Sequence, residues 1–258
     1  MNAANVEAAK FLLRQRISCL YLVHAKTDPE RFAELRLFLL SLGLKVTLPV
    51  HVYPEQFNRL LQQIKDRPES VSISMTMLRS LTHAEYTPEN IGHFGLSLDA
   101  YAHFTSPIRR YPDLLVHRAI RHIVRGGKPA KYDYKLGDME RLGMIASAHE
   151  RRAEEATRDV EAWLKCEYME NKVGEEFAGV VSGVTNFGVF VQISELLIDG
   201  LVHVTSLAND YYHFDSGSQQ LVGERSGKKY RLGDAIRVKV QRVDMETRRI
   251  DFAPAKEQ

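Results

Sequence analysis

The hydrophobic pattern of this chain changes its period near Lys172-Val173-Gly174. Before this point apolar residues recur at the three- and four-residue spacing of helices. After it, short β-rich runs are separated by turn residues. The change predicts two domains, a mainly helical one over residues 1–173 and a β-rich one over residues 174–254, and therefore an α+β fold class.

Start and stop signals divide the helical part. Asp28-Pro29 is a cap and first-turn pair for a helix that should end at Gly43, and Pro54 opens another helix. Gly126-Gly127 and Pro129 break the chain before a long amphipathic helix. The predicted helices cover residues 5–16, 29–43, 71–81 and 134–169, with further helices from 54 and after 106 and a short strand over 19–23.

About five β-rich segments follow in the second part of the chain. Around five strands in so short a sequence suit a small closed barrel such as the OB-fold, because closure removes the sheet edges. The predicted strands cover residues 177–184, 188–193, 199–204, 235–243 and 249–252, with one further segment near 229–231.

Composition limits the classes of function. The chain has 258 residues, 44% hydrophobic and 26% charged, so it can bury substantial cores. Its apolar runs are too short to cross a bilayer, so we expect no membrane partner and a cytoplasmic location. Cys19 and Cys166 lack metal-ligand spacing and are expected to be buried thiols. The net charge of +2 is too small to indicate nucleic-acid binding, so any basic surface must be local.

Residues 101–118 combine aromatic side chains, a Ser-Pro helix start and three arginines. Thr105 or Ser106 can cap a helix with Pro107 in its first turn, which would place the helix start beside the arginines. Such a site suits phosphate, although a structural cluster of arginines and carboxylates explains the same residues equally well. The expected apolar stripe of this helix consists of Ile108, Leu114, Leu115 and Ile120.

This stretch, with His93-Phe-Gly-Leu96 before it, resembles the signature of the ribonuclease II/R family of processive 3′-to-5′ exoribonucleases, in particular its ribonuclease R branch. The resemblance implies that residues 1–173 are the carboxy-terminal part of an RNB catalytic domain. It makes Arg109 the catalytic arginine, which grips the scissile end of the RNA. Asp113 either orients an arginine or is a plain helix-surface carboxylate. His117 is expected to be a buried, hydrogen-bonded histidine rather than a general base. The residues implied to contact RNA here are His93, Tyr101, Arg110 and Arg118, with core packing as the competing account for the first two.

The β-rich part resembles the S1-type RNA-binding domain. In that family Phe187, Phe190 and His203 face the ligand, where bases stack on flat side chains, and Tyr211 with Tyr212 would extend the platform. Core packing is the competing explanation for any aromatic residue in a strand. Residues 225–242 hold seven Lys and Arg residues against the single acid Asp234, which indicates either a phosphate-binding stripe or a solvated loop. Its implied RNA contacts include Lys228, Lys229 and Arg242.

Two functions follow as expectations. The family resemblance implies hydrolysis of RNA to nucleoside 5′-monophosphates with Mg²⁺, acting on single-stranded RNA and RNA with 3′ overhangs. The family's metal-binding aspartates lie in a motif upstream of the matched region, so we expect no metal site in this chain and no cleavage by it alone. The alternative is a non-catalytic protein that binds single-stranded RNA and serves as a scaffold.

Overall fold

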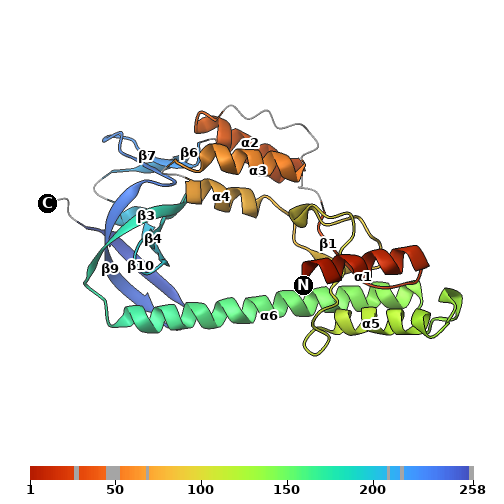
Figure 1. Cartoon of the computed structure of the whole chain (residues 1–258). Coiled ribbons are helices and arrows are strands. Elements are labelled where there is room, and N and C mark those ends of the chain that lie inside the picture. The colour runs from red at the N-terminus through yellow and green to blue at the C-terminus, as the bar shows by residue number, and fades with distance from the viewer. Residues whose placement is uncertain (26–28, 45–52, 68–69, 208–209, 216–217, 256–258) are drawn as a thin grey trace. The chain divides into compact units, whose positions relative to one another are not determined.

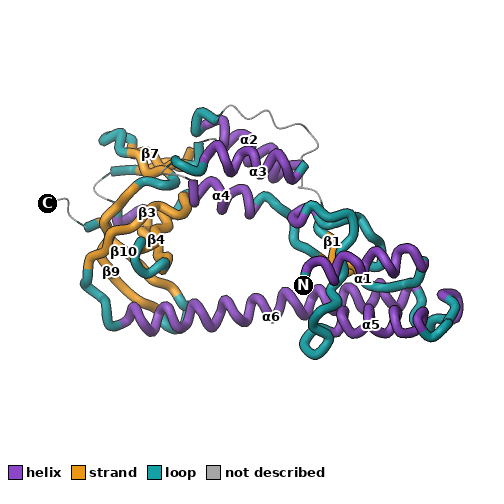
Figure 2. Tube along the Cα trace, in the orientation of Figure 1, coloured by secondary structure: helices purple, strands orange, loops and turns teal. Residues whose placement is uncertain are grey.

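A computed structural model describes residues 1–25, 29–44, 53–67, 70–207, 210–215 and 218–255 (Figure 1). The predicted cap residue Asp28 lies outside these residues. Helices occupy the first part of the chain and most strands the last part, which confirms the predicted α+β class (Figure 2). The α-helices are α1 (Asn2–Gln15), α2 (Pro29–Ser41), α3 (Pro54–Ile64), α4 (Ser70–Arg79), α5 (Tyr111–Val124) and α6 (Leu136–Glu170).

The chain divides into two compact units by its internal contacts. The first unit comprises Met1–Asp28, Val50–Phe57 and Leu81–Glu155, and the second comprises Pro29–Pro49, Asn58–Ser80 and Ala156–Gln258. This division follows spatial contacts rather than chain order, so the boundary at residue 173 stays a prediction.

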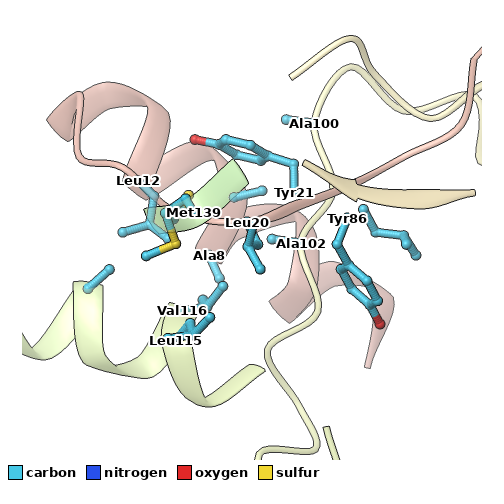
Figure 3. Close-up of a cluster of buried hydrophobic side chains, with 14 of the residues drawn as sticks. Ala8, Leu12, Leu20, Tyr21, Tyr86, Ala100, Ala102, Leu115, Val116 and Met139 are labelled. Atoms are coloured by element: carbon cyan, nitrogen blue, oxygen red, sulfur yellow. The ribbon is translucent and has the colours of Figure 1, made fainter. Parts of the chain in front are cut away.

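The core of the first unit joins α1, α5 and the start of α6 to a small antiparallel sheet of β1 (Tyr21–Val23) and β2 (Glu85–Thr87). Leu12, Val116 and Met139 are fully buried in it, and Figure 3 shows this cluster of apolar side chains. Gly143 lets α6 approach β2, because a Cβ atom there would lie 2.4 Å from the carbonyl oxygen of Tyr86. This close contact packs β2 directly against α6.

Helices α2, α3 and α4 confirm the predicted helical segments between residues 29 and 81. The Pro residues at the starts of α2 and α3 suit the first helical turn, where an N–H is not needed. Leu35 and Phe38 of α2 are buried, as are Ile73 and Met77 of α4, and the two helices contact each other. These helices belong largely to the second unit.

The five strands predicted for the barrel form one closed barrel in the order β10-β5-β4-β3-β9. The alternation of buried and partly exposed side chains fits a barrel strand: Val189, Val191 and Ile193 of β4 are buried, whereas Phe190 and Gln192 are partly exposed. The barrel strands are β3 (Glu176–Thr185), β4 (Gly188–Ile193), β5 (Ile198–His203), β9 (Ala235–Asp244) and β10 (Arg249–Pro254).

A three-stranded antiparallel sheet lies between β5 and β9 in the chain: β6 (Tyr212–Asp215), β7 (Gln220–Gly223) and β8 (Lys229–Arg231). The segment near 229–231 is therefore a strand, but it pairs outside the barrel. The pattern of the sequence did not predict β6 and β7. Leu221 and Tyr230 of this sheet join the hydrophobic core of the barrel.

Candidate functional site

The prediction that Thr105 or Ser106 caps the arginine-bearing helix is wrong. Helix α5 begins at Tyr111, with Arg110 as its N-cap in an extended conformation and Pro112 in the first turn. The N–H groups of Arg109 and Arg110 donate to the carbonyl oxygen of Ser106 at 3.3 and 3.1 Å, so residues 106–110 form a tight turn ahead of the helix. Ile108, predicted on the buried stripe, is consequently fully exposed, whereas Leu115 is buried as predicted.

Asp113 explains why the turn forms there. Its side chain is completely buried, and its Oδ1 accepts the N–H of Ser106 at 2.8 Å. The Arg110 guanidinium donates to both carboxylate oxygens at 2.9 Å. A buried carboxylate needs such partners, and the paired geometry of the guanidinium is strong and directional. Asp113 therefore orients an arginine and is not a surface carboxylate.

Arg109 lies beside this clamp but is not part of it. It is exposed, and none of the described residues forms a hydrogen bond or ion pair with its guanidinium. The backbone on either side of Arg109 is held by the turn and by the buried carboxylate. The chain thus presents one arginine on a fixed support, where it can meet an anion.

Arg118 is on the exposed side of α5 and is held by two tyrosines. Its guanidinium donates to the Tyr134 hydroxyl at 2.7 Å and the Tyr111 hydroxyl at 3.3 Å, and it lies 5.7 Å from the Tyr111 ring centroid. A role in RNA binding remains a prediction for Arg118. To bind RNA, the Arg118 guanidinium would have to donate to a phosphate in addition to the two tyrosine hydroxyls, or in place of them.

His117 packs against the preceding extended segment. Its ring stacks on Phe104 with 4.2 Å between the centroids, and its Nε2 atom lies 2.8 Å from the Phe104 carbonyl oxygen. This environment favours the hydrogen-bonded interpretation of His117 over a general base.

His93 and Tyr101 lie together in a cluster of aromatic rings. Their ring centroids are 5.7 Å apart, and His93 also stacks on His24 at 5.2 Å. Tyr101 is buried and its hydroxyl accepts a hydrogen bond from Asn5 at 2.8 Å, so the core-packing account applies to Tyr101. His93 instead lines an open depression of about 380 Å³ together with Phe94.

His103, Tyr86 and Glu150 form a second polar group that the sequence did not single out. The Tyr86 hydroxyl lies 2.8 Å from His103 Nδ1 and 3.4 Å from Glu150 Oε1. The available signal was the position of His103 inside the same motif, two residues after Tyr101. His103 therefore connects the motif to α6 through a shared hydroxyl group.

Burial sets the charge of these imidazoles. Loss of solvent, followed by the positive charge of Arg110, lowers the pKa of His103 to about 4. Burial and the neighbouring His24 lower the pKa of His93 to about 4. Both rings are therefore neutral at pH 7, and the positive charge of this surface resides on arginine. A base or sugar can therefore stack on the uncharged rings, while an anion binds separately to an arginine.

The second unit brings Phe187, Phe190 and His203 to one end of the barrel. The Phe187 and Phe190 rings pack edge to face with centroids 6.0 Å apart. His203 pairs in register with Gly188, and the Val204 N–H donates to the Phe187 carbonyl oxygen at 2.9 Å. Phe187 is 44% exposed and Phe190 partly exposed, so neither ring is a core residue. Flat outward side chains of this kind can stack with bases.

The barrel register links Arg242 to the same outer surface. Phe190 pairs with Leu201, Leu201 with Asp251, and Asp251 with Arg242, so the four residues form one row across β4, β5, β10 and β9. Three strand spacings separate its ends by roughly 14 Å. The Arg242 guanidinium also pairs with Asp244 at 3.2 Å. This row places a cation within reach of a strand bound along the barrel.

The other predicted contacts of this domain lie on the three-stranded sheet. Tyr211 is 71% exposed just before β6, Lys229 begins β8, and Lys228 lies over the Tyr230 ring at 5.4 Å. Tyr212 packs on Tyr230 with centroids 5.7 Å apart and is partly buried, so of these two tyrosines Tyr211 has the more exposed ring.

The basic stretch over residues 225–242 is divided between two surfaces. Arg231 donates to Gln220 at 3.1 Å within the three-stranded sheet. Arg237 of β9 pairs with Glu176 of β3 at 3.6 Å. The basic residues of this stretch therefore lie partly on the small sheet and partly on the barrel strand β9.

In the described ranges, no group of three or more His, Cys, Asp or Glu side chains is placed to hold a metal ion. Cys19 and Cys166 are free and buried as predicted, and burial raises the pKa of the Cys19 thiol to about 12. No helix of the part that the structure describes is long and apolar enough to cross a membrane.

Comparison with known proteins gives matches along nearly the whole chain. Family models match the RNB domain over residues 1–126 and the S1 RNA binding domain over residues 170–253. Ribonuclease R of Vibrio cholerae is 48% identical over 98% of this chain and 32% of the relative, so the chain spans about a third of that length. Apo Mycoplasma genitalium RNase R superimposes with a TM-score of 0.91 at 26% identity, covering 99% of this chain and 40% of that one. The same protein in complex with ribose methylated single-stranded RNA gives a TM-score of 0.90 at 26% identity, with the same coverage. With both of its domains matched in this way, the chain belongs to the ribonuclease II/R family.

Proposed function

We propose that this chain forms the carboxy-terminal part of a processive 3′-to-5′ exoribonuclease that hydrolyses RNA to nucleoside 5′-monophosphates. The observation that carries the proposal is the contrast between neighbouring arginines. Arg110 is held by the buried Asp113, whereas Arg109 is exposed beside it. A guanidinium on a fixed support can neutralise phosphate charge as it develops in the transition state.

The residues around Arg109 then act in support. The Asp113–Arg110 pair fixes the turn that carries Arg109, so little reorganisation is needed when a phosphate binds. His93, neutral at pH 7, offers a ring beside the open depression for an unpaired base or ribose. Each of these contacts binds or orients RNA without moving a proton.

The ribonuclease II/R family implies a divalent metal, which activates water and stabilises the leaving oxygen when bound. The described residues do not fit such an ion, because none of their carboxylates gather in a group of three with other ligands. We place the Mg²⁺ ligands in an aspartate-rich motif outside these 258 residues and assign no step of the reaction to the metal here. On this proposal the 258-residue chain binds RNA without cleaving it.

The barrel captures the RNA substrate in this proposal. Phe187, Phe190 and His203 stack with bases, while Arg242 and the lysines near residue 228 contact phosphates. The complex of the Mycoplasma genitalium relative with single-stranded RNA supports this class of ligand. Single-stranded RNA and RNA with 3′ overhangs are the proposed partners, and the cytoplasm is the proposed location.

A non-catalytic RNA-binding scaffold is the alternative. One observation favours this alternative for the isolated chain: its described residues offer no metal-binding group. The two proposals share RNA binding and differ in whether these residues take part in hydrolysis when joined to the rest of a catalytic domain.

One experiment tests both parts. The purified chain is mixed with an end-labelled, unstructured RNA oligonucleotide and excess Mg²⁺, with intact Vibrio cholerae ribonuclease R as the positive control. We expect salt-dependent binding and no release of mononucleotides. Release that survives stringent purification would show that the metal site is within this chain. Absence of binding at low salt would overturn the role in RNA capture.

A further inference from the structure

Asp210 holds together two parts of the small sheet that are distant in sequence. Its Oδ1 atom accepts the N–H of Tyr211 at 2.8 Å and the N–H of Arg225 at 3.0 Å. Its Oδ2 atom accepts the N–H of Ser226 at 2.8 Å and the Ser226 hydroxyl. One carboxylate therefore joins the chain before β6 to the loop between β7 and β8.

The loop closes around this carboxylate through further backbone bonds. The Glu224 N–H donates to the Tyr211 carbonyl oxygen at 2.8 Å, and the Gly227 N–H donates to Gly223 at 3.0 Å. The Ser226 hydroxyl oxygen also accepts the N–H of Lys228 at 3.2 Å. A Cβ atom on Gly223 would lie 2.5 Å from Asp210 Oδ2, so a side chain at residue 223 would displace the carboxylate from this position.

Three cations lie in this loop and at the start of β8, next to an exposed ring. Arg225, Lys228 and Lys229 are exposed, and Tyr211 is 71% exposed. The hydrogen bonds from Ser226, followed by the one from Arg225, lower the pKa of the Asp210 carboxyl to about 2. Asp210 is therefore ionised at neutral pH, and its lone pairs are directed at N–H and O–H donors of the loop.

We propose that Asp210 is a positioning residue for RNA binding. It fixes the Tyr211 ring and the cations at 225, 228 and 229 in one arrangement, in which a base stacks on the ring while the adjacent phosphates meet the cations. This inference rests on the proposed RNA-binding function and adds to it a second contact surface, separate from Phe187 and Phe190.

The proposal is tested by whether RNA binding becomes weaker or tighter when a negative charge is removed. Asp210→Asn and Glu224→Gln each remove one negative charge near the same cations. Simple electrostatics makes RNA bind more tightly to both variants, because repulsion of phosphate falls. If Asp210 positions the loop, Asp210→Asn instead weakens binding, and Glu224→Gln leaves it unchanged or tighter.

The measurement is titration of the full chain with a fluorescent oligouridine at several salt concentrations. For Asp210→Asn we expect the Kd to rise by roughly two- to thirtyfold, the range for loss of two exposed ion pairs. The slope of log affinity against log salt should flatten by up to about 0.7 for each lost phosphate contact. Circular dichroism and thermal melts confirm that the variants are folded.

A double-mutant cycle distinguishes positioning from a general structural effect. In a Lys228→Gln/Lys229→Gln background, Asp210→Asn should raise the Kd by a smaller factor than in the parent chain, because two of the contacts that it supports are already absent. Ser226→Ala, which removes one bond to Asp210, should show a smaller weakening and serves if Asp210→Asn does not fold.

Each outcome bears on a different proposal. If the parent chain binds RNA, Phe190→Ala weakens it and Asp210→Asn binds as tightly as the parent, the positioning role is wrong and the proposed function stands. An Asp210→Asn effect that persists undiminished in the double-lysine background also overturns the positioning role. If the parent chain binds no RNA at all, the proposed function itself fails.

Discussion

The arginine segment of the first unit and the ring-bearing surface of the second use similar residues in opposite ways. In and around residues 101–118, several charged side chains are held by other side chains: Asp113 holds Arg110, and Tyr111 with Tyr134 holds Arg118. On the barrel, Phe187 and Phe190 contact each other and remain open to solvent. A motif with many polar residues can therefore serve mainly to hold the fold, whereas a few exposed rings can form a binding surface.

This difference indicates which property of the protein a mutation in each region should change. A substitution in the first unit should mostly change the free energy of unfolding, with Arg109 as the exception. A substitution on the barrel surface should mostly change RNA affinity, because those rings support little of the core. The following predictions test that division, beginning with the largest expected effect.

Asp113→Ala should be the most destabilising of these changes. It leaves the half-buried Arg110 guanidinium and the Ser106 N–H without their partner, and loss of one member of a buried pair costs about 3–5 kcal/mol. Asp138→Ala is the control, because Asp138 also accepts a backbone N–H, from Lys135, but its ion pair with Arg141 is exposed. That control should lose only about 1 kcal/mol. Urea unfolding measures both, and equal losses would contradict the scaffold role.

Arg109→Ala should leave stability unchanged and reduce turnover. In a ribonuclease R-length enzyme that carries these residues, we expect the turnover number to fall by about 10²–10³ with a much smaller change in RNA affinity. Arg109→Lys retains the charge but loses the planar fork, and should recover only part of the rate. Single-turnover kinetics separate the two steps. Unchanged kinetics would mean that Arg109 has no part in stabilising the transition state.

Phe190→Ala and Phe187→Ala should each weaken RNA binding by about 1–3 kcal/mol, with little change in the salt slope. Trp163→Ala is the matched control, since Trp163 is 43% exposed on α6 and Phe187 is 44% exposed. Fluorescence titrations at several salt concentrations measure the effect. If the phenylalanine variants bind as tightly as the Trp163 variant, the rings do not stack with RNA.

The imidazoles should give the first unit a modest acid sensitivity. The pKa of His103 is lowered from 6.5 to about 4 in the folded chain, so only the unfolded chain takes up this proton between those values. Stability from this group is complete above pH 6.5 and is lost as the pH falls toward 4. His103→Gln should reduce the slope of melting temperature against pH in this window. Identical slopes in the variant and the parent chain would contradict the assignment.

Much of the fold was predictable because its signals are local. The short β-rich runs between turn residues predicted the five barrel strands, and the Pro residues at 29 and 54 predicted helix starts. The strands β6 and β7 were missed because they are short and depend on pairing with each other and with β8. Four residues carry too little periodicity to identify a strand.

The candidate site divides in the same manner. The order of residues along the chain was enough to predict the family resemblance, the five barrel strands and the separation of a helical part from a β-rich part. The start of α5 at Tyr111 instead depends on the folded chain, because Asp113 accepts the Ser106 N–H and Ser106 does not cap the helix. The contact between Asp210 and Arg225, and the row that Phe190 shares with Arg242, likewise form only in the folded chain. Helix and strand patterns follow from neighbouring residues, whereas these contacts follow from hydrogen-bond donors and strand registers that meet only when the chain has folded.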